Sequence, residues 1–240
     1  MASSVSKLVQ LCSDRQEIQN ILGTYCRAID RCDVELLKSI YHPDGTDNHG
    51  PYAASAHEFA DIIVKRLKEV VNYGFHTVTH SVIDVHGKFA TSESYYYGYH
   101  TVGPGYDKIA EFFGKKYADE QVRGGKIGQT HEYVAAGRYL DVLERRNGKW
   151  KILHRSITNE WGQCQPTNLI TDEGEPGRFV LPGARDRSDP VYGLMAKIPK
   201  AKAKVKVKAK PTARKALPAA ARKGAKGAAR AASRNKRLRR

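Results

Sequence analysis

An aspartate and a histidine are candidates for acid–base chemistry, because each stands where the pattern calls for an apolar residue. Asp30 lies two steps of four residues after Leu22, so it continues the buried face of a predicted helix. His80 follows Val78 by two residues, on the inward face of a predicted strand. A carboxylate or an imidazole that faces a core must be paired, or its pKa must shift. The two residues therefore suggest a catalytic pair.

Such a pair would act as a general base. Asp30 would accept a hydrogen bond from one ring nitrogen of His80 and raise the basicity of the other nitrogen, which could take a proton from a substrate. His100 lies on the inward face of the next strand among small residues, so it, Tyr25 or Tyr97 could return a proton to a departing oxygen. This chemistry needs no metal and no cofactor, and we predict neither.

Each of these residues also has a structural interpretation. A single histidine in a strand is more often a packed or surface residue than a catalyst. Asp30 could simply pair with Arg27 or Arg31 near a helix end. Five histidines have no second line of support and are interpreted as surface or structural: His42, His57, His76, His86 and His131. His76 and His80 would lie about 13 Å apart along one strand face, too far to share a metal ion.

Two further residues are assigned to the pocket by alternation alone. His154 alternates with Ile152, which makes it a weak candidate for a pocket residue. Arg138 alternates with Ala136 and Leu140, where a buried guanidinium would be costly unless it had a role. We expect both side chains to face inward.

The elements that must position these residues follow from hydrophobic periodicity. Apolar residues at helical spacing predict three N-terminal helices, separated by a polar loop or short strand over residues 47–53. After Gly74 the period changes to two, and Asn147-Gly148 is a hairpin turn signal. The predicted helices cover residues 13–29, 33–41 and 55–71, and the predicted strands cover residues 75–86, 89–102, 130–145 and 149–161. A short helix over 109–117 is possible within the interruption at 103–129.

Helices followed by long antiparallel strands predict an α+β fold. A curved antiparallel sheet closed by the three helices would form a cone-shaped α+β barrel, and its interior would be a small-molecule pocket. The residues before Lys197 thus favour a small pocketed enzyme over a nucleic-acid-binding protein.

Charge divides the chain into regions. Of 41 Lys and Arg residues, 18 lie in residues 197–240, which contain no Asp or Glu, so residues 1–196 hold 23 basic and 25 acidic residues. We predict a domain over 1–165, an extended arm over 166–196 and a disordered basic tail over 197–240, because the tail has too little apolar surface to form a core. The net charge of +16 therefore describes the tail.

The cysteines and the N-terminus indicate the compartment. The four cysteines form no C-x-x-C pair and have no zinc-ligand spacing, which favours free thiols in a reducing environment. The first residues lack the apolar core of a signal peptide, and no stretch approaches the ~20 apolar residues of a membrane span. We therefore predict a cytoplasmic protein.

Three segments resemble the SnoaL-like branch of the nuclear-transport-factor-2-like superfamily. They are YCRAIDRCDVELLKSIYHPDG, HTVTH and GRYLDVLERRNGKWKILHRSITNEW, within about residues 10–165. Scytalone dehydratase and hexachlorocyclohexane dehydrochlorinase are similar members. The segment YHPDGTDNHG is similar to diarylpropane lyases, which release formaldehyde from lignin-derived diols without a cofactor.

The resemblance implies an α+β cone and a catalytic Asp–His pair, which by motif falls on Asp30 and His80. It also implies a second histidine at His100, in the GYH segment. Where scytalone dehydratase has a tyrosine after the second helix, this chain has His49, so the identity of the acid is open. The long insert at 103–129 could form a lid or reshape the mouth of the pocket.

These features predict a cofactor-independent lyase for a hydrophobic, aromatic substrate, such as a lignin-derived compound, with loss of water or formaldehyde. Asp30, His80 and His100 would be catalytic, and the substrate would be bound by Tyr25, His49, Tyr97, Arg138 and His154. A dimer or trimer is expected, as in similar proteins. The alternative is a non-catalytic binding or scaffold protein whose basic tail contacts nucleic acid or another polyanion, without sequence preference.

Overall fold

The computed structural model describes residues 4–170, 173–178 and 183–198 of the 240-residue chain. These residues belong to one unit that ends at Ile198. The predicted basic tail, 197–240, lies outside the described residues except for its first two positions. In the described part of the chain, no helix is long and apolar enough to cross a membrane.

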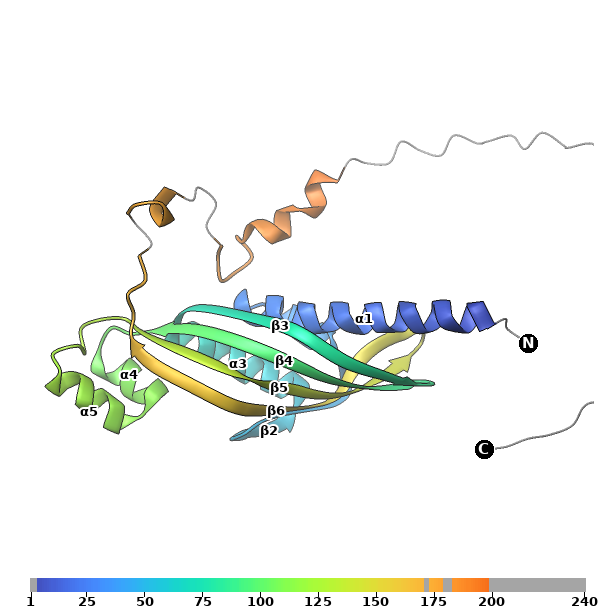
Figure 1. Cartoon of the computed structure of the whole chain (residues 1–240), viewed down its shortest axis with the longest axis horizontal. Coiled ribbons are helices and arrows are strands. Elements are labelled where there is room, and N and C mark those ends of the chain that lie inside the picture. The colour runs from blue at the N-terminus through green and yellow to red at the C-terminus, as the bar shows by residue number, and fades with distance from the viewer. Residues whose placement is uncertain (1–3, 171–172, 179–182, 199–240) are drawn as a thin grey trace, which may run out of the picture. The chain divides into compact units, whose positions relative to one another are not determined.

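A six-stranded curved sheet dominates the domain, with the strand order β2-β1-β6-β5-β4-β3 (Figure 1). All neighbouring pairs are antiparallel except β1 and β6, which run parallel. With the helices packed against the sheet, this arrangement confirms the predicted α+β cone. The strands are β1 (Tyr41–His49), β2 (Tyr52–Ser55), β3 (Val71–His86), β4 (Phe89–Val102), β5 (His131–Arg146) and β6 (Lys149–Pro166).

The first helix, α1 (Ser4–Asp30), is longer than predicted. Asp14, near the predicted start at residue 13, lies within the helix and is 4% exposed. Its Oδ1 accepts hydrogen bonds from Arg145 Nη1 at 2.7 Å and from the indole of Trp150 at 2.9 Å. Asp14 thus fixes α1 to the β5–β6 hairpin.

Two shorter helices follow, each with a side-chain cap at its N-terminus. In α2 (Val34–Ser39) the N-cap Asp33 accepts from the Leu36 amide, and in α3 (Ala56–Val70) the N-cap Ser55 accepts from the Glu58 amide. The segment predicted as a polar loop or short strand, 47–53, belongs to the β1–β2 hairpin, in which β1 pairs with β6.

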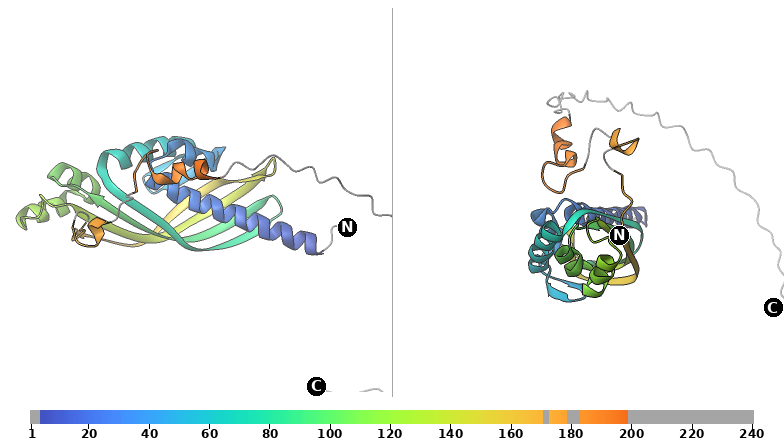
Figure 2. Two further views of the ribbon diagram at one scale, coloured as in Figure 1. Left: turned by 90° about the horizontal axis from the view of Figure 1, so that it is seen from above. Right: turned by 90° about the vertical axis from the view of Figure 1, so that its left-hand side faces the viewer.

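The insert at 103–129 forms two helices, α4 (Tyr106–Phe113) and α5 (Lys115–Arg123), instead of one short helix. Gly114 separates them with a φ of 93°, a conformation that favours glycine. Seen end-on, α4 and α5 lie across one end of the domain (right panel of Figure 2).

Two β-bulges change which side chains face the interior. In β3 the partner register shifts between Val78 and His80, so Thr79 is the extra residue. In β6 it shifts between Ile152 and His154, so Leu153 is the extra residue. Because side chains alternate along a strand, one extra residue moves every following side chain to the opposite face.

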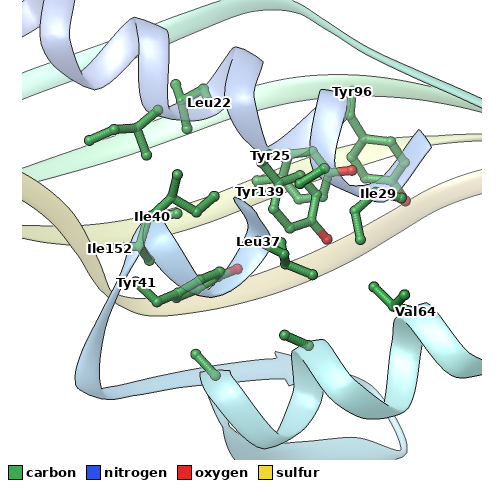
Figure 3. Close-up of a cluster of buried hydrophobic side chains, with 14 of the residues drawn as sticks. Leu22, Tyr25, Ile29, Leu37, Ile40, Tyr41, Val64, Tyr96, Tyr139 and Ile152 are labelled. Carbon is green, nitrogen blue, oxygen red and sulfur yellow. The ribbon is translucent and has the colours of Figure 1, made fainter. Parts of the chain in front are cut away.

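The core lies between the concave face of the sheet and helices α1, α2 and α3. Figure 3 shows Tyr25 and Ile29 of α1 close to Tyr96 of β4 and Tyr139 of β5, with α3 on the other side. Tyr96 and Tyr139 stack with ring centroids 4.5 Å apart, and Tyr25 meets Tyr139 edge-on at 5.1 Å. This aromatic group forms one wall of the space described below.

Residues 183–198 return to the outer side of the helices. Asp189 forms an ion pair with Arg31 at 2.9 Å, and the Tyr192 hydroxyl donates to Asp33 at 2.7 Å. Arg185 donates to the carbonyl oxygens of Leu67, in the last turn of α3, at 3.0 Å, and of Val71, the residue that follows α3. The segment therefore helps to cap the C-terminal end of α3.

Candidate active site

The interior holds a cavity of about 290 Å³ between α1, α3, α4 and the concave face of the sheet. Its volume is at the lower end of the range for small-molecule sites. Most of the wall is apolar, and polar groups enter at a few points. The apolar wall includes Ile29, Ile63, Leu67, Val70, Phe112 and Ile157.

At one end of the cavity, Asp30 holds His76 by two hydrogen bonds. The ring Nδ1 of His76 lies 2.7 Å from Asp30 Oδ1, and the His76 amide donates to Asp30 Oδ2 at 3.0 Å. Asp30 is 5% exposed and stands behind His76, which lines the cavity. A carboxylate on Nδ1 fixes the tautomer that leaves Nε2 unprotonated, so His76 can accept a proton from a ligand.

The position of Asp30 and β3 explains why this pair forms. β3 is an edge strand, so one side of its backbone has no neighbouring strand. The carboxylate at the C-terminal end of α1 takes the place of such a neighbour for the His76 amide. Across the β3–β4 ladder His76 faces Gly98, whose missing side chain leaves room for the imidazole.

His100 completes this end of the cavity. Its ring meets the ring of His76 edge-on, with centroids 4.8 Å apart, and its Nδ1 is buried without a hydrogen-bond partner among the described residues. Burial lowers the pKa of His100 well below its ordinary value, and the nearby His76 and Arg185 add to this. His100 is therefore neutral at neutral pH, which suits it to hydrogen bonding with a ligand more than to donating a proton as imidazolium.

The structure does not form the predicted Asp30–His80 pair. His80 is exposed on the outer face of β3, where its ring stacks on Tyr95 with centroids 4.5 Å apart. The bulge at Thr79 is the reason, because it places His80 on the face opposite to His76. His76, which was interpreted as surface or structural, is the histidine that meets Asp30.

Three of the predicted substrate-binding residues also lie on the outer face. Tyr97 contacts Trp161 with ring centroids 6.3 Å apart. The bulge at Leu153 turns His154 outward, where its Nδ1 lies 2.6 Å from the Thr46 hydroxyl. None of these side chains lines the cavity.

Arg138 is the third of these residues. The inward face of β5 carries Tyr133, Ala135 and Tyr139, so Arg138 points away from the cavity. Its guanidinium pairs with Glu93 at 2.8 Å and with Glu160 at 2.7 Å across the outer face. The charge that seemed costly in a core is instead a partly exposed ion-pair network.

The other end of the cavity contains a second imidazole–carboxylate pair. His49 Nδ1 forms a short hydrogen bond with Asp47, and Asp47 Oδ2 accepts from the Tyr41 hydroxyl at 2.6 Å. His49 Nε2 lies 3.2 Å from the hydroxyl of Tyr25. The His49 ring stacks on Phe59 of α3. The predicted pocket residues Tyr25 and His49 both line the cavity, in contact with each other.

A buried cation lies beneath Tyr25. Arg155 is fully buried and forms two 2.7 Å hydrogen bonds to Asp141, while its guanidinium lies 4.1 Å from the Tyr25 ring centroid and 4.5 Å from that of Tyr139. Its Nη1 has no hydrogen-bond partner among the described residues. Burial, with the nearby Asp47, raises the pKa of Tyr25, so this phenol stays protonated.

Sequence reasoning missed three of these groups: His76, Asp47 and Arg155. Gly98, in register with His76, is the signal that could have favoured His76 over His80, once the strands are aligned. Asp47 and His49 are two residues apart and share a strand face, but the segment was interpreted as a loop or short strand. In the described residues, no group of three His, Cys, Asp or Glu side chains is arranged to hold a metal ion.

Several solved structures have a similar fold. A type 2 hexachlorocyclohexane dehydrochlorinase shares 17% identity over 72% of this chain and 99% of its own, with a TM-score of 0.52. The type 3 enzyme from Novosphingobium barchaimii LL02 shares 18% identity over 69% of this chain and 97% of its own, with a TM-score of 0.51. A nuclear transport factor 2-like superfamily protein from Salmonella enterica serovar Typhimurium LT2 shares 18% identity over 68% and 99%, with a TM-score of 0.47.

Among curated proteins the comparison found no match. The model of the SnoaL-like domain matches residues 10–156, which include most of α1 and most of the sheet. This match covers more than half of the chain and agrees with the cone seen in the structure. The chain therefore belongs to the SnoaL-like domain family.

Proposed function

We propose that the protein is a cofactor-independent lyase in which His76, held by Asp30, removes a proton from a hydrophobic, aromatic substrate. The 2.7 Å contact between Asp30 and His76, with the imidazole at the wall of an apolar cavity, is the observation that carries the proposal. Two structurally similar proteins are dehydrochlorinases, which is consistent with a proton-abstracting site in this fold.

The reaction would begin with a proton passing to His76 Nε2, and Asp30 would stabilise the resulting imidazolium. For water loss, the electrons of the broken C–H bond form a double bond and the adjacent C–O bond breaks. For formaldehyde loss, a primary hydroxyl gives up its proton, the C–C bond breaks, and its electrons form the alkene as a neighbouring hydroxyl departs as water. In both cases the leaving oxygen must receive a proton, which His100 could guide by hydrogen bonding.

A 1,2-diarylpropane-1,3-diol with 4-hydroxyphenyl rings tests the proposal directly. Alkene absorbance and released formaldehyde would be followed together, alongside a β-hydroxy aryl ketone as the probe for water loss. We expect His76→Gln and Asp30→Asn each to lower turnover by about 10²–10⁴-fold, the range for general acid–base groups. Thermal unfolding would confirm that both variants are folded.

His80→Gln is the matched control, since His80 lies on the same strand but outside the cavity. It should retain wild-type turnover. Wild-type activity in the His76 and Asp30 variants would refute the assignment of the base. Absence of turnover with both probes, with ligand binding intact, would favour a non-catalytic binding protein.

A further inference from the structure

We propose that Tyr25, His49 and Asp47 form a second proton-transfer site, which binds a weakly acidic hydroxyl of the ligand such as a phenol. The inference rests on the proposed function only in assuming that the same cavity receives the substrate. This site would bind the hydroxyl of a phenol at a point separate from the Asp30–His76 base.

The hydrogen bonds define a direction for proton transfer. Because the carboxylate of Asp47 can only accept, His49 Nδ1 carries the proton and His49 Nε2 accepts from the Tyr25 hydroxyl at 3.2 Å. The Tyr25 oxygen is then available to accept from a ligand hydroxyl in the cavity. A proton could move from the ligand to Tyr25 while the proton of Tyr25 moves to His49, which leaves an ionised ligand and an imidazolium stabilised by Asp47.

The positive charge of Arg155 favours an anion near Tyr25, although burial outweighs it for the phenol of Tyr25 itself, which stays protonated. The fully buried Arg155 lies 4.1 Å from the Tyr25 ring centroid, and one of its nitrogens has no hydrogen-bond partner among the described residues. Asp141 balances most of this charge through its two 2.7 Å hydrogen bonds. In an apolar cavity, a cation and a potential imidazolium stabilise an oxyanion more than they would in water.

The two sites are placed to contact different parts of one ligand. Tyr25 and Asp30 are both on α1, five residues apart, so they are offset by about 7.5 Å along the helix axis. His49 comes from β1, near one edge of the sheet, and His76 from β3, at the other edge. A ring hydroxyl at Tyr25 would leave the reacting carbon nearer to His76.

The test compares the binding of 4-nitrophenol with that of its methyl ether, 4-nitroanisole, which cannot donate a proton. We expect wild-type protein to bind the phenol about tenfold more tightly than the ether, the ratio that 1.4 kcal/mol of hydrogen bonding gives. Below the pKa of the free phenol, the bound phenol should also show more of the phenolate absorption band than the free phenol does.

Tyr25→Phe and His49→Gln should abolish both the preference and the band, while ether binding shows that each variant is folded. His154→Gln is the control, because this histidine contacts β1 from the outer face and does not line the cavity. His76→Gln should retain the preference. An equal affinity for both probes in wild type, or a preference that survives both pocket variants, would overturn the proposal. Loss of preference in His76→Gln alone would place the hydroxyl at the other site and would also overturn it.

Discussion

The two ends of the cavity hold similar groups that are assembled in different ways. Asp30 and His76 are 46 residues apart and come from a helix and an edge strand, so they meet only when α1 packs on β3. Asp47 and His49 are two residues apart on β1, and a strand places such residues on one face by its own geometry. The first pair therefore depends on tertiary packing, and the second depends mainly on the formation of one strand.

The largest expected effect comes from Arg155, the buried cation beneath the Tyr25 end of the cavity. Arg155→Ala would leave Asp141 buried without its partner, and loss of one member of a buried pair costs about 3–5 kcal/mol. Urea unfolding would measure this change. Arg138→Ala is the control, since that arginine is paired on the outer face, and its loss should cost less than about 1 kcal/mol. Equal losses would contradict the contrast between the two arginines.

Removal of each carboxylate should change hydrogen exchange over a different part of the structure. Asp30→Ala and Asp47→Ala each leave two donors without an acceptor, at about 1–3 kcal/mol for a buried unsatisfied group. Hydrogen exchange should speed up in Asp30→Ala over the last turns of α1 and the facing part of β3. In Asp47→Ala the change should stay within β1 and its neighbours. The same exchange pattern in both variants would show that the pairs are not assembled differently.

The neutral His100 should make the His76 end sensitive to acid. Its pKa in the fold lies well below 6.5, so between these two values the unfolded chain binds a proton that the folded chain does not. Stability should therefore fall as pH decreases below about 6.5. His100→Gln should reduce this dependence, measured as the melting temperature between acidic and neutral pH. An unchanged slope would show that His100 is not the group responsible.

The smallest effect is expected at the glycine beside the two imidazoles. A methyl group on Gly98 would lie in van der Waals contact with both imidazoles, 3.4 Å from His76 Cδ2, 3.6 Å from His76 Nε2 and 3.7 Å from His100 Cε1, so Gly98→Ala should partly cover the basic nitrogen and lower turnover a few-fold. Gly23 lies on α1, where an added methyl group would have no side chain and no other element within 4 Å, so Gly23→Ala should leave turnover unchanged. As a change in a helix interior it should also stabilise the fold by about 0.5–1 kcal/mol. A similar loss of turnover in both variants would argue against a specific contact at Gly98.

The contrast between the Asp30–His76 and Asp47–His49 pairs also shows which features could be predicted from the sequence. Periodicity was sufficient for the α+β class, for the three N-terminal helices and for the long strands. It also marked Asp30 as a carboxylate in a buried position. These features depend on local spacing, which the sequence records directly.

The choice between His76 and His80 could not be made in this way. Both have the same parity in the sequence, and only the bulge at Thr79 separates them. A second bulge at Leu153 moved His154 outward and brought Arg155 inward. A bulge is set by pairing with the neighbouring strand, so alternation along a single strand does not reveal it.

Arg185 links a late part of the chain to the wall of the cavity. It binds the carbonyl oxygens of Leu67 and Val71, and both of those residues line the cavity. Residues 183–198 are therefore part of the framework that holds the cavity wall, although they follow the last strand of the sheet. A truncated protein designed to remove the basic tail, and nothing else, should keep every residue through Ile198. A truncation before Gly183 would also remove Arg185, which binds the end of α3. If such a protein lost ligand binding, the loss could not be attributed to the basic tail.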